Sequence, residues 1–296
     1  MRVLLLIVWA VSALGAEVQF LKPTDWLGDL LVTDSAILVG TTGKILELEK
    51  HGGIRRELPF PGGQAQALAW HREKGILAAG GWNFLRLWEW PSGQVFLDIT
   101  GLGTMARSLA FAGEVLLCGG ADGWVLAFDL AGRPLWRLKA HEGPVWGVAA
   151  AAELFATADG GRAVLWQLST RKELFSFPGR AWDVALSAQG FMLAAGVGKL
   201  LRIWDTALGL ALLEVWAHES CTVAVAFSPK GRGVATGSLD QTAALWDAET
   251  GAVLLRTPTF PAVLRAVSFS PDGAVLVAGA EDGTLALIPL APFFVE

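Results

Sequence analysis

An all-β protein built from repeats is predicted by three observations on this 296-residue sequence. First, a short apolar run that ends in Trp-Asp, or in a close variant, recurs along the whole chain. Second, the Trp position of these runs falls at residues 48, 88, 128, 166, 204, 246 and 288. Third, Gly, Pro, Asp or Ser bound each run of strand length. A period of about 40 residues with this strand ending is typical of a β-propeller.

The repeats follow one another without a linker, so the length does not indicate two domains. Their strand-like runs span residues 26–60, 65–100, 106–138, 144–177, 181–216, 222–257 and 264–290. Each of the first six repeats contains four runs; in the fourth repeat these are 144–150, 153–158, 162–168 and 172–177. Four runs of this length predict a four-stranded antiparallel blade.

The seventh repeat has only three runs, at 264–270, 274–280 and 284–290. Residues 18–22 (Val-Gln-Phe-Leu-Lys) provide a candidate for the missing strand, and residues 293–296 are the alternative. Closure of the ring would hide sheet edges that otherwise promote aggregation. We therefore predict a seven-bladed β-propeller of four-stranded antiparallel blades over residues 17–296, with the ring closed by the N-terminal strand.

The first sixteen residues are typical of a secretory signal peptide. Met1-Arg2 is a basic start, residues 3–14 are apolar apart from Ser12, and small residues precede Glu17. We predict cleavage after Gly15 or Ala16 and export to the periplasm or the exterior. The apolar stretch is short for a membrane span, and no membrane span is expected after cleavage. An uncleaved anchor and a first β-strand remain the alternatives.

Composition excludes some classes of protein. Hydrophobic residues make up 53% of the chain and charged residues 17%, which excludes a disordered protein. The net charge is −5 and no run of Lys or Arg is present, so nucleic acid is not an expected partner. Cys118 and Cys221 fall in repeats three and six, which are not neighbours in a ring, so we expect free thiols and no metal site. We expect a monomer.

Two repeats carry a polar pattern that makes the resemblance specific. The chain resembles the WD40-repeat family of propellers over residues 17 to about 290. In that family a His before the first strand, a Ser or Thr on the second, an Asp in the next turn and the Trp on the third form a structural hydrogen-bonded set. The resemblance implies two such sets here: His218, Ser238, Asp240 and Trp246; and His141, Thr157, Asp159 and Trp166.

Other motifs give no prediction of catalysis. His141-Glu142 and His218-Glu219 lack the second His of a zinc-protease helix. Residues 101–106 (Gly-Leu-Gly-Thr-Met-Ala) match a dinucleotide-binding pattern by letters, but they lie between two strands and are read as a loop. We therefore predict no catalytic residue, no metal and no cofactor.

One residue per blade, at the start of the first strand, is expected to line one end of the central channel. In WD40 propellers this rim position commonly contacts partners, and Trp and Arg dominate binding energy at interfaces. The expected rim residues are Gln66, Arg107, Trp146, Trp182, Val223 and Arg265, and the preceding loops add Gln64, Met105 and Arg180. The first repeat aligns too poorly for an assignment.

These observations lead to two hypotheses of function. The first is a non-catalytic, exported scaffold that binds a protein or an extended peptide through its Trp/Arg rim. The second is an exported propeller enzyme or quinone-binding protein, because residues 247–251 and 134–136 faintly resemble quinoprotein repeats. Asp183 is the one acidic residue expected to point inward, which counts against the second hypothesis.

Overall fold

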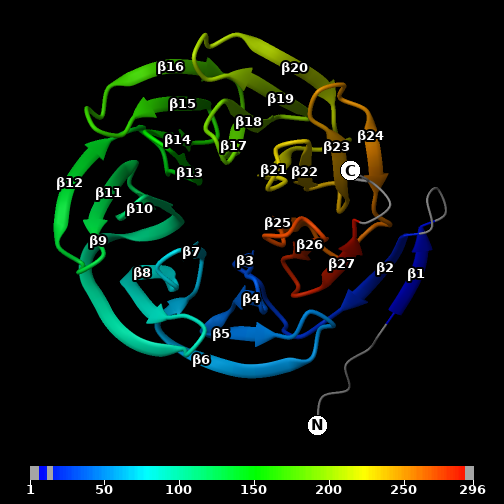
Figure 1. The fold of residues 1–296 in the computed structure, drawn as a ribbon, viewed down its shortest axis with the longest axis horizontal. Coiled ribbons are helices and arrows are strands. Elements are labelled where there is room, and N and C mark those ends of the chain that lie inside the picture. Colours follow the sequence, from blue (N-terminus) through cyan, green and yellow to red (C-terminus); the bar gives the residue numbers. More distant parts are fainter. Residues whose placement is uncertain (1–6, 12–15, 291–296) are drawn as a thin grey trace.

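The computed structural model describes residues 7–11 and 16–290, with side chains from Val18 onward. Small antiparallel sheets stand around a common centre, which is the arrangement of a β-propeller (Figure 1). The described residues contain strands, turns and loops but no helix, so none could serve as a helical membrane span. The prediction of an all-β propeller is confirmed.

Four of the sheets are four-stranded blades of consecutive strands. The first repeat forms β3 (Asp29–Val32), β4 (Ile37–Gly40), β5 (Thr42–Leu48) and β6 (Ile54–Gln64). The fourth forms β13 (Gly147–Ala151), β14 (Leu154–Ala158), β15 (Arg162–Gln167) and β16 (Glu173–Pro178). The fifth forms β17 (Ala181–Leu186), β18 (Met192–Val197), β19 (Leu200–Asp205) and β20 (Ala211–Trp216). The sixth forms β21 (Thr222–Phe227), β22 (Gly233–Ser238), β23 (Ala243–Asp247) and β24 (Val253–Arg256).

The second and third repeats share one six-stranded sheet, so the described chain has six sheets and the prediction of seven separate blades is wrong. The strands of this sheet are β7 (Ala67–His71), β8 (Ile76–Glu89), β9 (Gln94–Ala112), β10 (Val115–Gly120), β11 (Trp124–Asp129) and β12 (Pro134–Lys139).

The two repeats merge because β8 and β9 continue through positions where turns are expected. Residues 101–105, read as a loop from the sequence, are part of β9, and Trp82 pairs with Met105. The Asn83 side chain accepts a hydrogen bond from the backbone N–H of Gly103 at 2.7 Å, which ties the two extensions together. Farther along, β9 pairs with β10 from Ala106 to Ala112.

The last sheet contains strands from both ends of the chain, in the order β1-β2-β27-β26-β25. Its strands are β1 (Ile7–Val11), β2 (Ala16–Leu21), β25 (Leu264–Phe269), β26 (Val275–Ala280) and β27 (Leu285–Pro289). Residues 19–21 of β2 pair with residues 285–287 of β27, and this is the N-terminal segment that the sequence indicated for the missing strand. The alternative segment, residues 293–296, lies outside the described residues.

β1 was not expected as part of the propeller, because it falls within the predicted signal peptide. It pairs with β2 on the side away from β27. Cleavage after Gly15 or Ala16 would therefore remove β1 and leave the pairing of β2 with β27 in place. The signal peptide stays a prediction.

Apolar contacts between neighbouring sheets form the core. Inner strands such as β4 and β22 are buried on both faces and read as continuous apolar or small-residue runs, whereas outer strands such as β12 and β20 alternate between exposed and half-buried residues. The first and last sheets are joined in the same way, since Leu27 and Leu30 pack with Val277 and Leu285. Each blade therefore depends on its neighbours for burial.

The antiparallel order places two kinds of loop on the same face of the ring. The loop that enters the first strand of a blade and the turn between its second and third strands lie at the same end of the blade. The turn between the third and fourth strands lies at the other end. We call the first face the entry face; both groups of residues described below lie on it.

Candidate functional site

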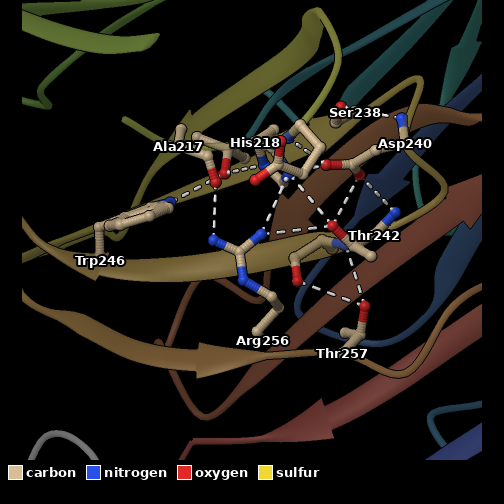
Figure 2. A network of polar contacts seen from close by, with 11 residues as sticks. Ala217, His218, Ser238, Asp240, Thr242, Trp246, Arg256 and Thr257 are labelled. Atoms are coloured by element: carbon tan, nitrogen blue, oxygen red, sulfur yellow. Dashed lines mark hydrogen bonds and ion pairs between the residues drawn. The ribbon is translucent and has the colours of Figure 1, made fainter. Parts of the chain in front are cut away.

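In the sixth repeat, the expected polar set forms around a buried His (Figure 2). The Trp246 indole N–H donates to Thr236 Oγ1 at 2.9 Å, and Thr236 Oγ1 lies 2.8 Å from His218 Nε2. On the other side of the ring, His218 Nδ1 lies 3.1 Å from Asp240 Oδ2. Asp240 also accepts the Glu219 N–H at 2.9 Å, so it holds the loop that enters β21, the first strand of the same blade.

The fourth repeat repeats this geometry with its own residues. Trp166 Nε1 donates to Thr157 Oγ1 at 2.9 Å, and that hydroxyl lies 2.7 Å from His141 Nε2. His141 Nδ1 lies 3.2 Å from Asp159 Oδ2. All four residues named from the sequence for this repeat are therefore brought together.

The set named for the sixth repeat needs one correction, because Thr236 and not Ser238 bridges the His and the Trp. The register explains the difference: Trp246 pairs with Val234, and the indole reaches the side chain two residues farther along β22 on the same face. In the fourth repeat, Thr157 is likewise two residues beyond the partner of Trp166. Ser238 instead accepts the backbone N–H of Asp240 at 3.0 Å within the turn.

Both His rings are best described as neutral. Burial lowers the pKa of His218 and of His141, against the opposing effect of the neighbouring Asp. A neutral ring with its proton on Nδ1 donates to the carboxylate and accepts the Thr hydroxyl proton at Nε2, and the hydroxyl oxygen then accepts from the indole. In the sixth repeat both ring nitrogens have hydrogen-bond partners, whereas in the fourth repeat His141 Nδ1 lies near Asp159 without a hydrogen bond.

Other members of the sixth-repeat network were missed by the sequence analysis. Thr242 Oγ1 donates to Asp240 Oδ1 at 2.7 Å, and Arg256 donates from Nη2 to the Ala217 carbonyl at 2.7 Å (Figure 2). Thr257 Oγ1 accepts the backbone N–H of Ala243 at 2.9 Å. The family's set of His, Ser or Thr, Asp and Trp does not include Thr242, Arg256 or Thr257. Their contacts depend on the register of β23 and β24, which the sequence pattern does not give.

The rim residues line a cavity of about 350 Å³ on the entry face. They enter it from the beginning of the first strand of different repeats or from the residue just before it: Gln66, Arg107, Trp146, Trp182, Val223 and Arg265. Gly28 occupies the corresponding place in the first repeat, which the alignment could not assign. Arg180 is exposed in the loop before β17 and is not among the lining residues, so this member of the predicted rim lies outside the cavity.

Arginine and tryptophan side chains are stacked on one wall of the cavity. The Arg107 guanidinium carbon lies 4.6 Å from the centre of the Trp146 ring, a cation–π contact. The Trp146 and Trp182 rings are 5.6 Å apart between centroids and tilted by 60°. These contacts fix the orientation of three large side chains before any partner is bound.

The remaining polar rim residues have partners of their own. Arg265 donates to Glu281 at 2.7 Å, and Gln66 donates from its side-chain amide to Gln64 at 2.9 Å. Arg265 is therefore neutralised by a carboxylate that also lines the cavity. Arg107 forms no ion pair among the described residues.

Two Asp residues line the cavity one position beyond the rim. Asp29 accepts the N–H of Leu30 at 2.7 Å and the N–H of Leu68 in the next repeat at 2.7 Å. Asp183 accepts from Val184 and Val225, both at 2.9 Å. Each carboxylate therefore links the first strands of adjacent repeats. Asp29 was missed by the sequence analysis because the first repeat could not be aligned.

Burial dominates the ionisation of both carboxyl groups. It raises the pKa of Asp29 and of Asp183 to about 7, although the backbone N–H groups lower it. In each group both oxygens already accept a backbone bond. This arrangement joins the first strands of adjacent repeats through each carboxyl group.

The thiols and possible metal ligands are dispersed. Cys118 and Cys221 are both free, and burial raises the pKa of Cys118 to about 12. Within residues 7–11 and 16–290, no three His, Cys, Asp or Glu side chains are grouped as metal ligands would be.

Comparisons with known proteins agree with this architecture. The family model "WD domain, G-beta repeat" matches residues 211–247 and 255–288. An F-box/WD-40 repeat-containing protein of Arabidopsis thaliana is 27% identical over 181 residues, which cover 56% of this chain. The match spans only 34% of that protein's length. The matched repeats, the Trp-Thr-His-Asp sets and the ring of small sheets together support a WD40-repeat family for this chain.

Proposed function

We propose that this protein is a non-catalytic scaffold that binds a partner protein or an extended peptide in the entry-face cavity. The observation that carries the proposal is the gathering of Arg107, Trp146 and Trp182 on one wall of a cavity of about 350 Å³. Trp and Arg contribute most of the energy at many interfaces, and side chains already held in place lose little entropy on binding. WD40 repeats generally serve in protein interaction, which supports the same reading.

The alternative of a propeller enzyme has weaker support. The two carboxyl groups at the cavity, Asp29 and Asp183, are engaged with backbone N–H groups of adjacent repeats. In each polar His set, His Nε2 is engaged with a buried Thr hydroxyl that also accepts the Trp indole N–H. We therefore propose that both groups stabilise the ring and that recognition is left to the rim.

We further propose that the protein is exported, acts as a monomer and has a ring closed by β2. The support for export is the apolar N-terminal segment, and the support for closure is the pairing of β2 with β27. Sequencing the N-terminus of the protein recovered from the cell envelope or medium tests export. A mature start at Ala16 or Glu17 is expected, and a start at Met1 in the cytoplasmic fraction would contradict it.

Photo-crosslinking from the rim tests the scaffold role. A photoreactive amino acid placed at Gln66 or Val223 is expected to capture a defined protein from the envelope fraction. Capture should be lost in a folded Trp146→Ala/Trp182→Ala/Arg265→Ala variant. A matched control variant, Arg133→Ala/Lys172→Ala, alters exposed loops on the opposite face and should retain it. Equal capture by both variants would show that the binding site lies away from the rim.

A further inference from the structure

Arg107 differs from three other arginines, each of which pairs with a carboxylate. Arg265 pairs with Glu281 at 2.7 Å, Arg86 with Asp98 at 2.6 Å, and Arg202 with Glu214 at 2.5 Å. Arg107 has no carboxylate partner in the described part of the chain, and its Nε is buried without a hydrogen-bond acceptor. A buried guanidinium donor without an acceptor is unfavourable, so an acceptor brought by a ligand would gain a hydrogen bond here.

A second donor on the same wall is also without an acceptor. Trp182 Nε1 is buried and has no hydrogen-bond partner among the described residues. Trp146 lies between the two, in contact with Arg107 on one side and with Trp182 on the other. The wall therefore offers N–H donors together with apolar ring surface, which suits a ligand with an anionic oxygen and a hydrocarbon stem.

The charges around Arg107 also favour an anion. Burial lowers the pKa of Arg107, and the positive charge of Arg265 lowers it further. Because Arg265 is paired with Glu281, Arg107 is the arginine of the cavity that has no ion-pair partner among the described residues. A ligand with a single negative charge would balance its charge without disturbing that pair.

We propose that Arg107 binds a carboxylate of the ligand, the side chain of an Asp or Glu in an extended peptide segment, while Trp146 and Trp182 pack against the neighbouring methylene groups. This inference rests on the proposed scaffold function and specifies the chemistry of its partner. The planar guanidinium fork matches a carboxylate in a bidentate geometry. A phosphate group is less suitable, because Asp29, Asp183 and Glu281 line the same cavity and would repel a doubly charged group more strongly.

Binding of three short peptides, followed by the indole N–H signals of the full 15N-labelled chain, tests the proposal. The probes are acetyl-Ala-Glu-Ala-amide and its counterparts with Gln or phosphoserine at the central position. The Glu peptide is expected to shift the Trp182 and Trp146 signals in a saturable way, with the signals assigned from Trp→Phe variants. The Gln peptide cannot form the bidentate, charge-assisted pair, so its binding should be weaker than that of the Glu peptide by about tenfold or more.

Variants at Arg107 separate a binding role from a structural one. Arg107→Gln should abolish the preference for Glu over Gln, and Arg107→Lys should retain part of it, because it keeps the charge but lacks the fork. Arg202→Gln, which removes an arginine from a paired site on the fifth blade, is the matched control and should bind as the original protein does. Circular dichroism and the melting temperature show that each variant is folded.

Several results would overturn the inference. The inference fails if the Glu and Gln peptides bind equally, or if the phosphoserine peptide binds more tightly than the Glu peptide. It also fails if Arg107→Gln keeps the preference for Glu, or if no peptide gives a saturable shift. The scaffold function would fail separately, through the crosslinking experiment. Capture of a partner that depends on Trp146 and Trp182 but not on Arg107 would keep the scaffold and reject the carboxylate.

Discussion

Thr236 Oγ1 accepts the Trp246 indole N–H at 2.9 Å while it lies 2.8 Å from His218 Nε2. One hydroxyl group thus connects the third strand of the blade to the loop that enters its first strand. The same role is filled by Thr157 between Trp166 and His141. In both blades, therefore, one fully buried Thr hydroxyl is the hydrogen-bond partner of the Trp indole N–H and of His Nε2.

Thr236→Val is expected to lower the free energy of unfolding by about 1–3 kcal/mol, because the indole N–H and the His ring each lose a partner in a buried site. Ser238→Ala is the matched control on the same strand, since Ser238 only accepts a turn N–H. Its effect should be smaller. Urea unfolding of the two variants measures both values, and a larger loss for Ser238→Ala would contradict the assignment of Thr236.

Removal of β2 tests its role in the last sheet. A chain that starts at Pro23 lacks the pairing with β27 and the buried side chains of Val18, Phe20 and Leu21. Burial of each such side chain contributes about 1.5–3 kcal/mol, so a large fall in melting temperature is expected. A chain that starts at Ala16 keeps β2 and lacks β1, and it should melt close to the full chain. Equal melting of the two truncated chains would contradict closure by β2.

The ionisation of Asp29 and Asp183 should lower stability as the pH rises from about 4 to about 7, whereas the lowered pKa of His218 and of His141 acts in the opposite direction in the upper part of this window. In the folded protein the pKa of Asp29 and Asp183 is about 7, above the ordinary value of 3.8. The native state therefore holds protons that the unfolded state releases in this window, and each pKa unit corresponds to about 1.4 kcal/mol. The loss is complete above the folded pKa.

Substitution of one carboxyl group checks the origin of this pH dependence. Asp29→Asn should reduce the slope of the unfolding free energy between pH 4 and pH 7, as followed by urea unfolding at several pH values. Asp272→Asn is the control, because the Ser270 hydroxyl and backbone N–H groups hold the pKa of Asp272 below its usual value. It should leave the slope in this window unchanged. A slope in the Asp29→Asn/Asp183→Asn variant that equals that of the original protein would refute the assignment.

Gly283→Ala should destabilise the protein more than Gly43→Ala. Both glycines have a positive φ, of 84° and 77°, so alanine is strained at either position by about 1 kcal/mol or somewhat more. A Cβ at Gly283 would also lie 2.1 Å from the Thr24 carbonyl oxygen, whereas a Cβ at Gly43 would meet open space. The difference in melting temperature between the two variants measures the clash alone.

Thiol reagents should label Cys221 well before Cys118. Cys118 is fully buried and its pKa is raised to about 12, so almost no reactive thiolate is present at neutral pH. Cys221 is only half-buried, in the loop before β21. Mass spectrometry after timed alkylation gives both rates, and faster labelling of Cys118 would indicate that β10 opens readily.

Most of the architecture could be predicted from the sequence, because every blade must pack against its neighbours and this requirement produces the repeat pattern. The Trp positions mark the third strands, and counting along each first strand places Arg107, Trp146 and Trp182 at one cavity. The merging of repeats two and three was missed because it depends on Asn83, whose side chain bonds a backbone group twenty residues away. Ser238 was chosen over Thr236 for a similar reason, since only the pairing of Val234 with Trp246 sets which hydroxyl the indole reaches.

The pairing of β2 with β27 also has a consequence for how the chain reaches its native state. Residue 19 meets residue 287, so this contact cannot form until almost the whole polypeptide has been synthesised. Contacts between residues so far apart in sequence carry a large entropy of loop closure and form slowly. A strand that leaves the ribosome early is thus among the last to find its final neighbour, and the edge of β27 stays unpaired until then.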